Sequence, residues 1–129
     1  MNLAIATQRK RQVIDITGVV EQQLPPRATG AVAVTVLHTT AALTTADLDP
    51  GTDQDLLDFL EAVTPPVAWR HPHNPRHAPD HLLASIIGPS VVLPVRDGQL
   101  VLGTWQRLVL IELDGPRERN LTVTILASH

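Results

Sequence analysis

A chain of 129 residues fits a single domain over 1–129, and 43% hydrophobic with 18% charged residues is an ordinary globular composition. The formal net charge of −3 argues against a dedicated nucleic-acid-binding protein, which normally carries a basic surplus. The chain has no cysteine, which excludes disulfides, thiolate metal ligands and cysteine nucleophiles. No run approaches the roughly 20 apolar residues of a membrane helix, and residues 1–7 are too short and polar for a signal peptide. We therefore expect a cytoplasmic protein with no membrane or nucleic-acid partner.

The first half of the chain predicts three strands and two helices. They are strands over 13–17, 31–37 and 41–45 and helices over 19–24 and 54–62. Thr52 or Asp53 is expected to cap the second helix, because a side-chain oxygen there accepts a hydrogen bond from an otherwise unpaired helix amide.

The second half begins with a long segment over 65–80 that contains five prolines, which favours an ordered loop or lid. One helix and four strands are expected after it. They are a helix over 79–87 and strands over 91–95, 100–103, 108–113 and 121–126. Asp97-Gly98 between apolar runs is a strong hairpin signal, and Asp114-Gly115 predicts a second turn. This order of elements indicates an α+β fold.

Histidine is the first candidate for chemistry, because four of the six histidines lie between residues 71 and 81. They are His71, His73, His77 and His81. With His38 upstream, they could supply imidazole ligands to zinc or another divalent metal, or move protons near pH 7 without a metal. The alternative is a solvated proline-rich loop that happens to contain histidines. Pro79 between His77 and His81 makes a shared helical face for these two doubtful.

Asp47 is the candidate carboxylate. Together with His38 and His81 it could act in catalysis or hold a divalent metal such as magnesium or zinc. The alternative is that Asp47 and Asp49 are turn formers whose side chains bind nearby backbone amides.

Arg117 and Arg119 form the cationic candidate. Their guanidinium groups match phosphate oxygens in two-point contacts, and alternate residues of an extended segment point the same way. The alternative is that they face water or pair with Glu112 or Glu118. Glu112 lies in an apolar strand, so its burial would indicate Arg117 or a histidine beside it.

Two further polar groups are candidates for a pocket. Thr40 is favoured over Thr39 to share a pocket with His38, because adjacent strand residues point to opposite faces. Gly103-Thr104-Trp105-Gln106 is a polar segment in an apolar region. In a chain so poor in aromatic residues, Trp105 indicates either a specific packing role or the wall of a pocket.

Four blocks in order, from about Thr29 to about Ile125, resemble the YjbQ-like family. They are His38-Thr39-Thr40-Ala41-Ala42-Leu43-Thr44, His81 in Asp80-His81-Leu82, the series Ser90, Gly98 and Gly103-Thr104-Trp105-Gln106, and Glu112 with Asp114-Gly115-Pro116-Arg117 and Arg119. The resemblance implies a mixed β-sheet folded into a half-barrel with two or three packed helices, assembled as a homotrimer. The chain departs from the family at Asp47, where glutamate is usual and one residue is missing.

The resemblance also implies an enzyme with secondary thiamine-phosphate synthase activity, which joins a pyrimidine diphosphate to a thiazole phosphate and releases pyrophosphate. Arg117 and Arg119 would hold phosphate, Asp47 would position a divalent ion, His38 or His81 would move protons, and Trp105 would wall the pocket. The alternative is a non-catalytic protein that binds a metal or a phosphorylated small molecule.

Overall fold

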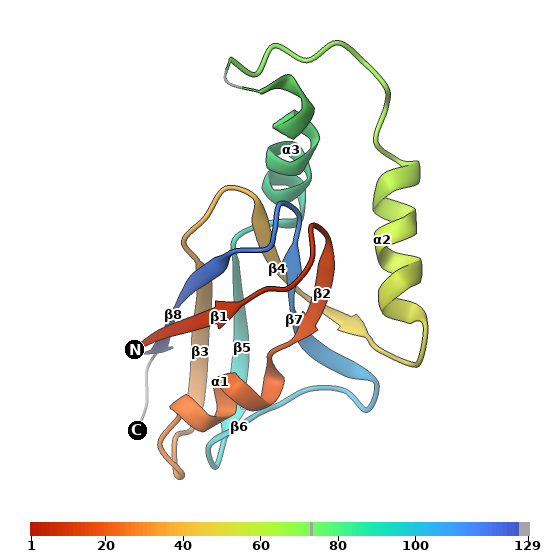
Figure 1. Ribbon diagram of the computed structural model, residues 1–129. Coiled ribbons are helices and arrows are strands. Elements are labelled where there is room, and N and C mark those ends of the chain that lie inside the picture. The colour runs from red at the N-terminus through yellow and green to blue at the C-terminus, as the bar shows by residue number, and fades with distance from the viewer. Residues whose placement is uncertain (73, 127–129) are drawn as a thin grey trace.

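A computed structural model describes residues 1–72 and 74–126. Its strands form a five-stranded sheet in the order β1-β8-β3-β5-β6 and a three-stranded sheet in the order β2-β7-β4 (Figure 1). The strands are β1 (Asn2–Ala6), β2 (Gln12–Asp15), β3 (Gly30–Val36), β4 (Ala41–Asp47), β5 (Ser90–Arg96), β6 (Gln99–Leu100), β7 (Gln106–Glu112) and β8 (Glu118–Leu126). The helices are α1 (Thr17–Gln23), α2 (Thr52–Ala62) and α3 (Ala78–Ile87), with a short 3₁₀ helix, η1 (Pro75–His77), before α3.

The expected α+β half-barrel is confirmed. The strand pairings within both sheets are antiparallel throughout the described residues, so these sheets are not mixed. One hydrophobic core lies between α1 and the strands, where Val20 packs with Val34 and Leu110. Valines alternate along β3, and Val32, Val34 and Val36 are all buried as their period-two spacing requires.

β7 carries side chains into two cores because neighbouring residues of a strand point to opposite faces. Leu108 and Leu110 belong to the core with α1, whereas Val109 and Ile111 pack in a second core with residues of α2 and α3. A strand buried on both faces reads as a continuous apolar run, which is what the sequence shows here. β7 therefore ends, at Glu112, deep inside the molecule.

Three local details differ from the sequence-based expectations. β1 was not predicted, and it pairs antiparallel with β8 along its whole length. The predicted cap of α2 is wrong, because Gly51 occupies the N-cap with a φ of 91° and no side chain caps the helix. Asp53 lies instead in the first turn of α2, where a carboxylate interacts favourably with the helix dipole. The strand expected over 100–103 is shorter and ends at Leu100.

The segment between α2 and α3 arches from the end of one helix to the start of the other (Figure 1). Pro79 falls within the first turn of α3, where a helix needs no amide partner. The expected helix over 79–87 is therefore confirmed, one residue longer at its start. Within the described residues, every helix is too short or too polar to span a bilayer.

Candidate functional site

A cavity of about 520 Å³ lies where the connection between β3 and β4, the segment from β7 to β8 and the start of α3 meet. Its lining residues are His38, Thr39, Thr40, His77, His81, Asp114, Arg117, Glu118 and Arg119. Segments far apart in the sequence thus bring together five predicted site residues. These are His38, Thr40, His81, Arg117 and Arg119.

His38 is held in one orientation by the backbone of β8. The N–H of Asn120 donates to His38 Nε2 over 2.9 Å, so the proton of the neutral ring is assigned to Nδ1. Burial lowers the pKa of His38 below 6.5, and the positive charges of Arg119 and Arg117 lower it further against the opposing effect of Glu112. His38 is therefore a neutral hydrogen-bond donor at pH 7.

Arg119 and Glu112 form an ion pair at the floor of the cavity, with side chains only 2% and 0% exposed. Arg119 Nε donates to Glu112 Oε1 over 2.8 Å, and Nη2 donates to Glu112 Oε2. Nη2 also donates to the hydroxyl and the carbonyl of Thr40, over 2.9 and 3.1 Å. Glu112 is thus buried, which is one of the two possibilities that its place in an apolar strand left open. Its partner is Arg119, as the alternative pairing of an arginine with Glu112 predicts, whereas Arg117 binds Asp114.

Thr7 adds a third partner to this buried carboxylate. Its hydroxyl donates to Glu112 Oε1 over 2.7 Å and accepts from the backbone N–H of Arg117 over 2.8 Å. Burial alone would raise the pKa of Glu112, but the hydrogen bonds from Arg119 and Thr7 outweigh it and leave the pKa below its usual value. The carboxylate therefore stays ionised. Thr7 was missed by sequence reasoning, because it follows a strand that was itself not predicted.

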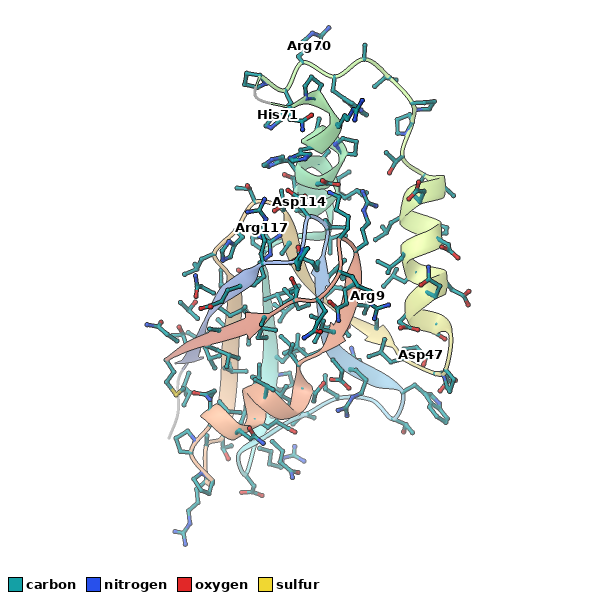
Figure 2. The ribbon with its side chains drawn as sticks, viewed as in Figure 1. Arg9, Asp47, Arg70, His71, Asp114 and Arg117 are labelled. Carbon is teal, nitrogen blue, oxygen red and sulfur yellow. The ribbon has the colours of Figure 1, made fainter. Side chains whose placement is uncertain are left out.

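Arg117 is the most accessible cation of the cavity, with a side chain 53% exposed. Its Nε donates to the carbonyl of Asp114 over 2.8 Å and its Nη2 to Asp114 Oδ2 over 3.2 Å. The two side chains lie side by side below α3 (Figure 2). These contacts leave Nη1 for a ligand. Arg119 is buried, whereas the exposed Arg117 can reach an anion directly.

Lys10 connects this cavity to the start of α3. Its Nζ donates to Asp114 Oδ1 over 2.8 Å and to Asp80 Oδ2 over 2.6 Å. Burial lowers the pKa of Lys10, but the hydrogen bonds to Asp114 and Asp80 have the larger combined effect, so its pKa is raised above 10.5. The pKa of Asp114 is lowered, since its bond to Lys10 outweighs the effect of burial. Sequence reasoning missed Lys10, which stands in a polar turn with no distinguishing spacing.

His77 and His81 both line the cavity, although His77 is the N-cap of α3 and only His81 lies within that helix. Pro79 lies in the first turn of α3, where its missing N–H costs no helix hydrogen bond. His77 Nδ1 lies 3.6 Å from Asp114 Oδ2. The ring of His81 packs against that of His71, with centroids 4.6 Å apart. His73 lies outside the described residues.

Asp47 lies away from this cavity, at the other end of β4 (Figure 2). β4 has seven residues, which places Asp47 about 20 Å from Thr40 along the strand. There Asp47, Thr104 and Trp105 line a separate hollow of about 210 Å³. Within one chain, the structure does not bring Asp47 together with His38 and His81. The backbone N–H of Asp49 binds Asp47 Oδ1 over 2.8 Å, as the turn-forming alternative predicts.

Gly103-Thr104-Trp105-Gln106 forms the turn that leads into β7. Gln106 Oε1 accepts from the N–H of Gly103 over 3.0 Å, and Gln106 Nε2 donates to the hydroxyl of Thr45 over 3.0 Å. Trp105 is 68% exposed. This segment therefore closes a turn and presents an indole at the surface, on the same side as Asp47.

The predicted metal ligands do not come together within one chain. Within residues 1–72 and 74–126, no three histidine or carboxylate side chains come close enough together to hold a metal ion. His38 uses Nε2 on a backbone amide, and Asp47 is remote. The described residues of one chain do not fit the predicted metal site formed by His38, His81 and Asp47.

The chain is thus a small α+β half-barrel protein with a polar cavity lined by histidines and arginines. Comparison with known proteins identifies its family. Residues 1–128 match the family described as UPF0047 protein YjbQ-like. The chain belongs to this family.

Relatives of similar length support the assignment. A UPF0047 protein of Archaeoglobus fulgidus is 40% identical over 127 residues, which cover 98% of this chain and 100% of the relative. The UPF0047 protein YugU of Bacillus subtilis is 34% identical over 130 residues, covering 96% of each chain. A crystal structure of a hypothetical protein from Aeropyrum pernix has a TM-score of 0.86 at 39% identity, covering 98% of this chain and 97% of that one. A conserved hypothetical protein from Thermus thermophilus has a TM-score of 0.89 at 35% identity, covering 98% of this chain and 99% of that one.

Proposed function

We propose that the cavity binds a small phosphorylated molecule and that the protein acts on it as an enzyme. The observation that carries this proposal is the half-exposed Arg117, placed in one cavity with three histidines. An arginine fork and imidazole donors match the oxygens of phosphate, and a cavity of about 520 Å³ lies in the range of small-molecule sites.

Some residues of the cavity would bind the phosphate directly, and others hold those residues in position. Arg117 offers Nη1, and His38 offers Nδ1–H as a neutral donor. Thr40 accepts from Arg119, so its own hydroxyl proton is free to donate. Arg119 holds Thr40 in place and adds positive potential from below. Phosphate would therefore meet donors from two segments, the connection between β3 and β4 and the one between β7 and β8.

His81 is the proposed proton-transfer residue. It lines the cavity from α3, and its ring nitrogens have no hydrogen-bond partner in the described part of the chain. An imidazole that faces a cavity can act as a general acid or base. His77 lies beside Asp114, so we assign it to binding the phosphate group and not to proton transfer.

The reaction proposed is the joining of a pyrimidine diphosphate to a thiazole phosphate with release of pyrophosphate. Both substrates and the leaving group are phosphorylated, so each needs cationic and hydrogen-bond donors of the kind gathered here. A bound divalent metal and a cytoplasmic location remain predictions. A non-catalytic binding protein is the second candidate, and the same Arg117-centred site would serve it.

The test measures thiamine phosphate formation by the wild type, His81→Ala and the control Arg96→Met, whose exposed side chain does not line the cavity. Each protein is purified identically from a host lacking its own synthase. We expect turnover in the wild type and the control and at least about a hundredfold loss in His81→Ala, typical of a missing general acid or base. Equal turnover in His81→Ala would exclude its role. If the wild type shows no turnover while pyrophosphate binds, the binding function replaces the enzymatic one.

We also propose a homotrimer in which one protomer's Asp47 and Trp105 approach a neighbour's cavity. The support is the separation of two groups of predicted site residues within one chain, together with the exposed Trp105. Native mass spectrometry tests the assembly. Mixing inactive Asp47→Asn and His81→Ala proteins then tests sharing, since a shared site restores part of the turnover and a site within one chain restores none.

A further inference from the structure

Two adjoining hollows lie between α2 and α3, apart from the cavity at His38. One has a volume of about 420 Å³ and the other about 440 Å³. They share four lining residues, namely Thr64, Pro65, Trp69 and Pro79, so they form one continuous groove. Thr64, Pro65 and Trp69 belong to the segment that joins α2 to α3 in Figure 1.

The first hollow is lined almost entirely by apolar side chains from both helices. Phe59, Val63, Leu82 and Ile86 are 64%, 52%, 43% and 81% exposed. Scattered exposed apolar residues need no explanation, but a contiguous set that lines a hollow marks a binding surface.

The second hollow is cationic. Lys10, Arg11 and Arg76 line it together with two carboxylates, Glu61 and Asp80, which leaves a surplus of one positive charge. Asp80 pairs with Lys10 and Arg11, whereas Arg76 forms no ion pair within the described residues. The cationic end is therefore not fully neutralised by the protein itself.

Arg11 supplies the observation that points to a ligand. Its Nη2 donates to Asp80 Oδ1 over 2.8 Å, but its Nη1 is buried without a hydrogen-bond partner. It is the one such side-chain atom in residues 1–72 and 74–126. A buried guanidinium nitrogen without an acceptor is costly, and an oxyanion in the second hollow would supply that acceptor.

We propose that the groove binds a single-chain amphiphile, with its apolar tail in the first hollow and a carboxylate head at Arg11 and Arg76 in the second. Trp69 lines both hollows and lies at the junction of head and tail. The charge at one end of an apolar groove is the feature that favours this occupant over a second copy of the chain. This site is independent of the proposed phosphorylated substrate, because it shares no lining residue with the cavity at His38.

The two tryptophans, Trp69 and Trp105, make the test direct. In Trp105→Phe, Trp69 is the only tryptophan, so its emission reports on the groove. Decanoate, added below its micelle concentration, should change this emission with saturation. Decanol and decyltrimethylammonium should bind about tenfold or more weakly, since neither offers an acceptor charge to the arginines. Trp69→Phe, in which Trp105 remains, should show no change.

Variants in the Trp105→Phe background separate the two hollows. Arg76→Met should weaken decanoate binding without unfolding the protein, because Arg76 is exposed and unpaired in the described residues. Ile86→Asp should weaken it through the tail, whereas Val92→Asp, a matched exposed apolar position on β5, should not. No saturable change with decanoate, or equal binding of decanoate and decanol, overturns the proposal. A third result would also overturn it. If the protein forms an oligomer that Ile86→Asp dissociates, and decanoate does not change the emission of Trp69, a second copy of the chain covers the groove.

Discussion

Arg119 and Glu112 lie on neighbouring ends of β8 and β7, and their ion pair is buried beneath the cavity at His38. Both side chains are fully enclosed, and further hydrogen bonds from Thr7 and to Thr40 satisfy them. A buried pair of this kind contributes little net stability compared with apolar residues, but the loss of one partner leaves an uncompensated charge. The pair therefore fixes Thr40 beside His38, and its integrity sets the shape of the site.

Arg119→Met should lower the free energy of unfolding by about 3–5 kcal/mol, because Glu112 is left buried without its partner. Urea denaturation measures the change. The double variant Arg119→Met with Glu112→Gln should recover part of the loss, since no charge is then stranded. A single variant as stable as the wild type would contradict the burial of this pair.

Stability should fall in acid because the folded-state pKa values of Glu112 and Asp114 lie below their ordinary values of 4.5 and 3.8. Each carboxylate contributes its full stability above the unfolded-state pKa, and that contribution is lost as pH falls through the folded-state value. Denaturation at a series of pH values should show the decline below about 4.5. Asp114→Asn should show a shallower decline. An identical slope in this variant would contradict the role of its carboxylate.

His38 should titrate below pH 6.5, because burial and then the charge of Arg119 disfavour its protonated form. The unfolded chain therefore binds the proton more readily between the folded-state pKa and 6.5, so protonation favours unfolding as pH falls through this window. NMR titration of the His38 ring protons measures the midpoint. Arg117→Met should raise that midpoint, since Arg117 also opposes the imidazolium. A midpoint at or above 6.5 in the wild type would contradict the assigned neutral donor.

Gln106→Ala should destabilise the fold by about 0.5–1.5 kcal/mol, because it removes the side-chain bonds to Gly103 and Thr45 that close the turn before β7. Trp105→Phe is the matched control. It should change stability by no more than about 0.5 kcal/mol, since Trp105 is 68% exposed. Thermal unfolding compares the two. The reverse order of effects would show that the indole, and not the amide, holds this turn.

The sequence predicted most of the strands and all three helices because their apolar periodicity is strong. The alternating valines of β3 and the continuous apolar run of β7 are the clearest cases. β1 was missed because its five residues are short of polar side chains and do not alternate between apolar and polar, so the period-two pattern of a half-buried strand is absent. The cap of α2 was missed because Gly51, in a left-handed conformation, begins the helix and leaves Thr52 no capping role.

The sequence predicted which residues belong to the site, but not how their side chains contact one another. The sequence identified His38, Thr40, His81 and Arg117, which the fold gathers in one cavity. It could not show that Arg119, and not Arg117, would be buried against Glu112, because Arg117 lies before β8 and turns toward Asp114. It also could not place Asp47, since the length of β4 separates this carboxylate from the histidines.

The most direct test of the central proposal is calorimetric titration with pyrophosphate of the wild type, Arg117→Met and the control Arg96→Met. Arg96 is an exposed arginine at the end of β5 that does not line the cavity. Binding to the wild type and to Arg96→Met should be equal, and binding to Arg117→Met about tenfold weaker, as the loss of a charge-assisted hydrogen bond predicts. Absence of binding to the wild type, or equal affinity in all three proteins, would contradict a phosphate site at Arg117.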